Sequence, residues 1–301
     1  MKPLYIYFLA ASLACTSCSD SWLDLNPSTS VPTDQAFSSL EDAQSALNGI
    51  YRLASAHSYY GDNFFYFGDC RAADVQARMT KGDGRRVSPY YEYNVKATDS
   101  FNSSLPWNQV YKVIRQTNNL IAATESGLIK TTDEAALNEI KAQALAMRGL
   151  ALYDLIRVFA MPYSYDNGQS LGVPIVTTAT DQSSKPARNT VAECYDQIIT
   201  DLTNSLAGLS KEKKDGCLNY WAVQGILSRV YLNKLDYPNA YKAATDIIEN
   251  SKSLYQLYTL DEYPTVWGKR IHQRIAFRIL LLADGTFRWF GWRRSSYGLC
   301  Q

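Results

Sequence analysis

Histidine is almost absent from this chain. Among 301 residues there are two, His57 and His272, and the second falls in a C-terminal segment of unusual composition. A serine–histidine catalytic site or a histidine-rich metal site would therefore depend on His57, and we expect neither. The chain also lacks a large excess of either positive or negative residues, since its formal net charge is +1. This argues against nucleic-acid binding driven by phosphate neutralisation. Beyond the N-terminal segment, no apolar run approaches the about 20 residues that a membrane-spanning helix needs.

Cysteine is present but forms no recognisable motif. Two of the six cysteines, Cys15 and Cys18, belong to the N-terminal segment. The other four are far apart and match no zinc or redox spacing: Cys70, Cys194, Cys217 and Cys300. We expect separate, mostly buried thiols, with a disulfide as the open alternative. We expect no metal ion and no cofactor.

The N-terminal segment has the pattern of a lipoprotein signal peptide. An apolar core of signal-peptide length, Leu4 to Ala14, is too short to span a bilayer and leads through small residues to Cys18, after which Ser19 and Asp20 begin a polar run. We predict a signal peptide at residues 1–17, acylation of Cys18 and a tether at residues 18–32. Two or more acyl chains would give durable membrane anchoring. An ordinary signal peptide, or acylation of Cys15 instead, are the alternatives.

Helical periodicity accounts for most of the chain after the tether. Three pairs fit the capping-box pattern of Ser or Thr followed three positions later by Glu: Ser38 with Glu41, Thr131 with Glu134, and Thr190 with Glu193. Apolar residues recur at helical spacing after each of these boxes and after Pro106. The segment that follows Glu134 is apolar on two sides, which predicts a helix buried between its neighbours and ended by Pro162.

The final periodic segments predict a helical hairpin, with helices at Tyr220–Lys234 and Tyr237–Asn250. Small residues and aromatic residues are mixed along it, as in tetratricopeptide helix pairs. We therefore predict an all-α fold of stacked helical hairpins, tetratricopeptide-like, with long irregular loops. Its body is expected at residues 33–268.

An aromatic, glycine-containing stretch interrupts this pattern at residues 57–105. A stretch of this length in a compact domain should contain a short helix, which we expect near Arg71–Arg78. Exposed rings can stack on the apolar faces of sugars while neighbouring polar groups form hydrogen bonds. The candidate ligand-binding residues are Tyr90, Tyr91, Tyr93, Phe101 and Asn102. Alternatively, the tyrosines only pack the loop onto the helices.

Several stretches, taken in order, resemble the SusD/RagB family of outer-membrane nutrient-binding lipoproteins. They are the leader Cys18–Pro27, the segment Trp107–Asn118, the segment Arg148–Leu155 with Phe159, Pro162 and Gly172–Pro174 after it, and the segments Pro186–Val191 and Tyr195–Ile198. The resemblance extends from Cys18 to about Gly268. Each stretch is weak alone, and their order along the chain makes the case.

The resemblance implies a specific function. Such proteins are lipid-anchored at the outer membrane and face the cell exterior, where they bind oligosaccharide, or peptide in some members. They act as a lid on a SusC-like TonB-dependent transporter, and they are not enzymes. An arc of surface aromatic rings holds the ligand, whereas the tetratricopeptide-like half mostly packs on the transporter.

The C-terminal end departs from the family. Family members are usually much longer, and residues 269–301 hold seven basic residues with Asp284 as the one acidic residue. We hypothesise that a reading-frame change near Lys269 created this tail; a natural basic aromatic tail that contacts lipid is the alternative. Two functions follow: a glycan-binding lid, or a truncated interaction module without a working ligand site. We expect ligand binding by this form to be weak or undetectable.

Overall fold

The computed structural model describes residues 37–61, 63–72, 88–94, 106–178, 184–213, 216–251, 254–255 and 259–261. The predicted signal peptide, Cys18, the tether, Phe101, Asn102 and the tail at 269–301 lie outside these residues. Within them, all regular elements are helices and no strand occurs, which confirms the predicted all-α class. No helix in the described ranges has the length and apolar character needed to cross a bilayer.

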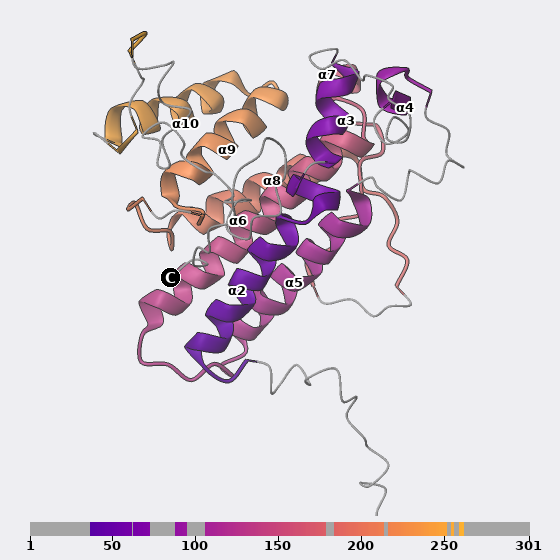
Figure 1. Ribbon diagram of the computed structural model, residues 1–301. Helices are drawn as coiled ribbons and strands as arrows, with labels where there is room; N and C mark the ends of the chain where they lie inside the picture. The colour runs from indigo at the N-terminus through magenta and orange to yellow at the C-terminus, as the bar shows by residue number, and fades with distance from the viewer. Residues whose placement is uncertain are drawn as a thin grey trace, which may run out of the picture.

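The long helices pack in succession across the molecule (Figure 1). Helices α2, α5 and α6 lie side by side, α8 packs on the other side of α6, and the α9–α10 hairpin follows α8. The bounds of the elements are α2 Leu40–Ala54, η2 His57–Gly61, α3 Asn63–Arg71, α4 Ser88–Tyr91, α5 Trp107–Glu125, α6 Glu134–Phe159, α7 Tyr163–Asp166, α8 Val191–Leu206, α9 Tyr220–Asn233 and α10 Tyr237–Asn250. The predicted hairpin at the C-terminal end is confirmed.

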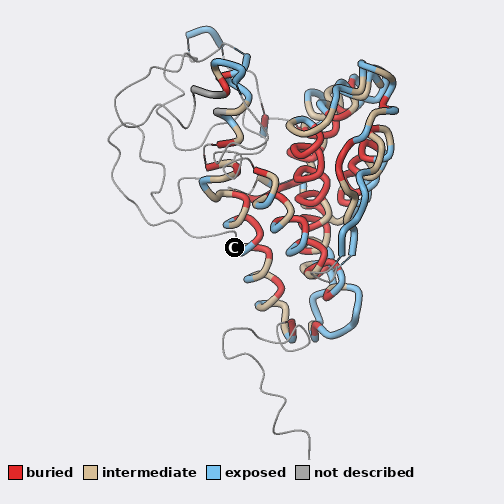
Figure 2. Tube along the Cα trace, turned by 90° about the vertical axis from the view of Figure 1, so that its right-hand side faces the viewer, coloured by how far each residue is buried: buried red, intermediate tan, exposed pale blue. Residues whose placement is uncertain are grey.

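Helix α6 is the centre of the fold. Its 26 residues are buried along most of their length, because α2 and α5 cover one side and α8 covers the other. Figure 2 shows the buried residues gathered on the facing sides of the helices. Gly149 permits the close approach of α8, since a Cβ at this position would lie 2.9 Å from Cγ of Leu202. The predicted burial of this helix on two sides is confirmed.

One predicted capping box is confirmed and two are wrong. Thr190 and Glu193 form the reciprocal pair at the start of α8. In α2 the pair is Ser39 with Asp42, one position later than predicted, because the same spacing recurs there and the Asp42 carboxylate accepts from both backbone and hydroxyl groups at this turn.

The start of α6 differs for a related reason. Its N-cap is Asp133, whose carboxylate accepts a hydrogen bond from the backbone N–H of Ala136 at 2.9 Å. The hydroxyl of Thr131 accepts instead from the backbone N–H of Asp133 at 3.0 Å. An aspartate two residues beyond the predicted threonine therefore takes over the cap.

The connecting segments contain short helices that the sequence pattern does not reveal. The short helix of the aromatic stretch, α3, ends at Arg71, the residue at which we expected it to begin. Residues 73–78 of the expected helix lie outside the described residues. The four-residue helices α4 and α7 were not predicted, because one helical turn carries no periodicity. A turn follows α7, with positive φ angles at Asn167 and Gly168.

The thiols follow the expectation only in part. Cys70 and Cys194 are buried free cysteines, as predicted. Cys217 is disulfide-bonded, so the expectation of a separate thiol is wrong at this position.

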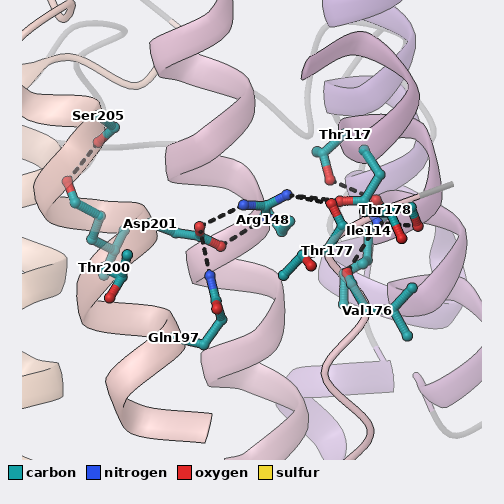
Figure 3. A network of polar contacts seen from close by, with 12 residues as sticks. Ile114, Thr117, Arg148, Val176, Thr177, Thr178, Gln197, Thr200, Asp201 and Ser205 are labelled. Atoms are coloured by element: carbon teal, nitrogen blue, oxygen red, sulfur yellow. Dashed lines mark hydrogen bonds and ion pairs between the residues drawn. The ribbon is translucent and has the colours of Figure 1, made fainter. Parts of the chain in front are cut away.

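A buried polar network joins α5, α6 and α8 (Figure 3). Arg148 of α6 donates two hydrogen bonds to the carboxylate of Asp201 on α8, at 2.7 and 2.6 Å. It also donates to the side-chain oxygen of Asn118 on α5 and to the carbonyl of Thr177. The Asn118 amide in turn donates to the carbonyls of Val176 and Thr178. Asn118 and Arg148 belong to two of the stretches that carry the family resemblance, and here they hold an irregular segment against three helices.

Candidate functional site

An aromatic cluster formed by residues of η2 and α3 contacts the C-terminal half of α6 through the side chains of Asp154 and Arg157. The rings of Tyr59 and Tyr60 are stacked, with centroids 4.1 Å apart and planes inclined by 19°. Phe64 meets both rings edge-on at 5.8 and 5.5 Å, and Phe65 lies 6.0 Å from Tyr60. Tyr59 is fully buried, whereas Phe65 is 44% exposed. The cluster therefore runs from the core to the surface, and Phe65 is the member that a ligand could reach most easily.

A buried carboxylate fixes the inner part of this cluster. Asp154 of α6 accepts a hydrogen bond from the hydroxyl of Tyr59 at 2.7 Å and another from the hydroxyl of Tyr60. Arg157 lies 3.4 Å from the other carboxylate oxygen. Burial raises the pKa of Asp154, and burial with the nearby Asp154 charge raises the pKa values of Tyr59 and Tyr60 well above their usual range. The two tyrosine rings are thus anchored to α6.

The three predicted tyrosines occupy different environments. Tyr90 is 2% exposed and packs edge-on against Phe67 at 5.4 Å, so its ring supports others and is closed to a ligand in this structure. Tyr91 is half-buried. Tyr93 is 67% exposed, and its hydroxyl donates to the carbonyl of Arg71. Among these three, Tyr93 has the geometry needed for stacking on a ligand.

Arginines cover several rings at this end of the molecule. The guanidinium of Arg71 lies 4.8 Å from the ring centroid of Phe67 and 5.9 Å from that of Tyr93. Arg157 lies 5.7 Å from Phe64 and 5.3 Å from Tyr153. We call the exposed part of this region, formed by Phe65, Arg71, Tyr93 and Arg157, the aromatic surface.

Three of these four residues were absent from the sequence prediction. Phe65 belongs to a run of aromatics, Phe64 to Phe67, that signals a partly exposed cluster but does not say which ring faces solvent. Nothing in the local sequence places Arg157 beside Phe64, because the two are far apart along the chain. Only the tertiary fold brings them together.

A second concave surface lies over α8, α9 and α10. It is a groove of about 650 Å³ whose lining includes Tyr220, Gln224, Tyr231, Tyr241, Asp246 and Asn250. The Asp246 carboxylate accepts hydrogen bonds from the Tyr220 hydroxyl and the Gln224 amide, both at 2.8 Å. Although burial opposes the shift, hydrogen bonds from Asn250, Tyr220 and Gln224 lower the pKa of Asp246. The sequence prediction contains no site here.

The comparisons with known proteins identify the fold. A family model described as "Starch-binding associating with outer membrane", for the SusD-like family, matches residues 21–232. The chain belongs to the SusD-like family. A SusD-like protein of Bacteroides ovatus is 26% identical over 262 residues, which cover 83% of this chain and 45% of the relative. SusD-like protein P2 of Formosa agariphila is 30% identical over 256 residues, covering 83% of this chain and 47% of that protein.

Solved structures of SusD superfamily proteins share the helical scaffold. One from Bacteroides thetaiotaomicron is 62% identical with a TM-score of 0.75, and the match covers 78% of this chain and 51% of the other. One from Bacteroides vulgatus is 31% identical with a TM-score of 0.71, covering 77% and 52%. The SusD-like chain therefore spans about half the length of these relatives.

Proposed function

We propose that this SusD-like protein is a non-enzymatic, cell-surface lipoprotein that binds oligosaccharide for uptake through a SusC-like TonB-dependent transporter of the outer membrane. The family description supports starch or related glycan as the ligand class and the outer membrane as the location. The observation that carries the proposal is the aromatic surface, where Phe65 of α3 and Tyr93, just after α4, expose their rings.

The chemistry of the aromatic surface suits sugars. A pyranose ring presents an apolar face that can stack on Phe65 or Tyr93, and its hydroxyl groups can accept hydrogen bonds from the guanidinium groups of Arg71 and Arg157. The exposed rings would be supported on the side facing the core by the more buried rings of Tyr59, Tyr60 and Tyr90. We retain Tyr91, Phe101 and Asn102 as proposed contacts.

The groove over α8, α9 and α10 favours a second candidate function, that of an interaction module. Tyr241, in the lining of this groove, and Ile248, on the same helix, are 75% and 76% exposed, so a protein partner could bury both side chains. In this alternative the helices bind a protein partner, such as the transporter, and the chain binds no glycan. The chain spans about half the length of its relatives. Both functions, which are functions of a whole protein, are therefore proposals for this chain.

Affinity gel electrophoresis against a panel of polysaccharides separates the two candidates. Retardation of the chain by at least one polysaccharide is expected, with dissociation constants near the millimolar range because single stacked rings contribute only about 0.5–1.5 kcal/mol each beyond burial. A pull-down against a SusC-like TonB-dependent transporter runs in parallel. Capture of the transporter without retardation by any glycan would support the interaction module instead.

The proposed anchor has its own test. Cys18→Ala should abolish incorporation of a labelled fatty acid and leave an uncleaved precursor. The matched control is Cys15→Ala, which should be labelled normally. Labelling that persists in the Cys18 variant would contradict acylation at this position.

A further inference from the structure

The arginines at the aromatic end of the molecule form a pattern that neutral glycan binding does not require. Three arginines lie over rings around α3, α4 and the C-terminal end of α6: Arg71 on Phe67 and Tyr93, Arg157 on Phe64 and Tyr153, and Arg188 on Trp107. Trp107 packs edge-on against Phe159, the last residue of α6, at 4.9 Å.

Two of these arginines cover rings that lie on one side of α3. Phe64 and Phe67 are three residues apart on this helix, so their side chains share a face. Arg157 covers the first ring and Arg71 the second. Three residues of helix, about 4.5 Å of rise, therefore separate the two ring positions over which the guanidinium groups lie.

These guanidinium groups are available to an anion. Arg71 is exposed and forms no ion pair with any residue that the structure describes. The side chain of Arg157 is 40% exposed, and its 3.4 Å contact with Asp154 is long for a charge-assisted hydrogen bond. Asp154 itself is occupied by the hydroxyls of Tyr59 and Tyr60. The exposed carboxylates nearby, Asp69 of α3 and Glu92 directly after α4, form an ion pair with neither arginine.

We propose that the aromatic surface selects acidic oligosaccharides, with the Arg71 and Arg157 guanidinium groups pairing with carboxylate or sulfate groups while Phe65 and Tyr93 stack on sugar faces. Arginine suits this role because its planar fork binds carboxylate and sulfate in a bidentate manner and remains charged at all accessible pH values. The overall net charge of +1 is too small to attract polyanions in general, so a preference must come from a local surface. This inference rests on the proposed glycan-binding function.

The test compares polysaccharides that share a backbone and differ in charge. Purified chain immobilised on an interferometry sensor is titrated with polygalacturonate and its fully methyl-esterified form, and with dextran sulfate and dextran. We expect the charged member of at least one pair to bind about tenfold more tightly in about 0.1 M salt, and the preference to collapse near 1 M as the Debye length shortens from about 10 Å to about 3 Å. The first pair reports on carboxylate and the second on sulfate.

Matched variants locate the effect. Arg71→Gln and Arg157→Gln should each weaken binding of the charged polymer about five- to tenfold, and the corresponding lysine variants should fall between these and the wild type. Arg115→Gln removes an exposed arginine of α5 that forms none of the ring contacts above, and it should bind like the wild type. Thermal unfolding of each variant checks that the fold is retained.

The outcomes are distinguishable. Equal binding of charged and neutral polymers, or an equal loss in the Arg115 variant, would overturn the acidic selectivity while leaving glycan binding intact. Failure of every polymer to bind, charged or neutral, would overturn the proposed function together with this inference.

Discussion

Two regions of the molecule combine an arginine with a carboxylate. One is the buried polar network that joins α5, α6 and α8, here called the joint, and the other is the aromatic surface with the neighbouring Asp154. They differ in how completely the charged groups are paired. At the joint, Arg148 is 7% exposed and Asp201 1% exposed, and they share two short hydrogen bonds. At the aromatic surface, the Arg157 side chain is 40% exposed and only loosely paired with Asp154. The first arrangement fixes the fold, and the second leaves cationic groups free for a ligand.

The comparison also explains where the family resemblance lies. Asn118 and Arg148, which lie in stretches that carry the resemblance, donate hydrogen bonds to the backbone carbonyls of residues 176–178. The exposed residues Phe65 and Tyr93 lie in the stretch where no family motif was recognised. A scaffold residue is constrained by its partners, whereas a surface ring can vary with the ligand.

The largest effect on stability is expected from a substitution that breaks the joint. Arg148→Ala leaves the Asp201 carboxylate buried without its cationic partner, which should lower the free energy of unfolding by about 3–5 kcal/mol. Urea unfolding monitored by circular dichroism measures the loss. Arg115→Ala, at an exposed position of α5, should change stability by less than about 0.5 kcal/mol. Similar stabilities for the two variants would show that the joint is not a determinant of the fold.

A smaller effect concerns the approach of α8 to α6. Gly149→Ala places a Cβ 2.9 Å from Cγ of Leu202 and should destabilise the protein by about 1–3 kcal/mol through overpacking. Gly49→Ala is the matched control, because nothing lies within 4 Å of its added Cβ in α2, and it should stabilise by about 0.5–1 kcal/mol through helix propensity. Thermal unfolding compares the pair, and effects of the same sign would contradict the close packing at Gly149.

The inner anchor of the aromatic cluster predicts a pH dependence. The folded-state pKa of Tyr59 lies well above its unfolded value of about 10, so the unfolded state loses this proton first as pH rises. Folding stability should therefore fall above about pH 10, by up to about 1.4 kcal/mol per pH unit for this group. Tyr59→Phe should make the decline in unfolding free energy shallower by that amount. An unchanged slope would mean that Tyr59 can ionise within the fold.

The smallest effects concern the exposed rings. Phe65→Ala and Tyr93→Ala should each weaken polysaccharide binding by about 0.5–1.5 kcal/mol, or about two- to tenfold, with little change in thermal stability. Tyr241→Ala removes an exposed tyrosine of α10 and serves as the matched control. A loss confined to the Tyr241 variant would move the ligand to the groove over α8, α9 and α10.

Much of the scaffold follows from the sequence, because long amphipathic helices carry strong periodicity. The bounds of α10 and the capping box of α8 agree with prediction. The starts of α2 and α6 were misplaced, since Ser39 and Asp133 compete with the predicted caps at neighbouring positions. Cap choice depends on hydrogen bonds that a spacing rule cannot rank.

The binding surface is harder to predict, because exposure depends on which element covers each ring. Tyr90 and Tyr93 have similar local sequence, yet Tyr90 is buried against Phe67 and Tyr93 faces solvent. The contact of Arg157 with Phe64 joins residues that are far apart in the sequence and that only the tertiary fold brings together. Aromatic composition indicates that a ligand surface exists, and the tertiary contacts decide its members.

Photo-crosslinking tests the central claim most directly. Oligosaccharides carrying a diazirine, prepared from a polysaccharide that retards the chain, are irradiated with the protein, and the modified peptides are identified by mass spectrometry. We predict adducts within residues 59–71 and 88–94 and on the end of α6 near Arg157. Adducts confined to α9 and α10, with none in these segments, would contradict the aromatic surface as the ligand-binding site.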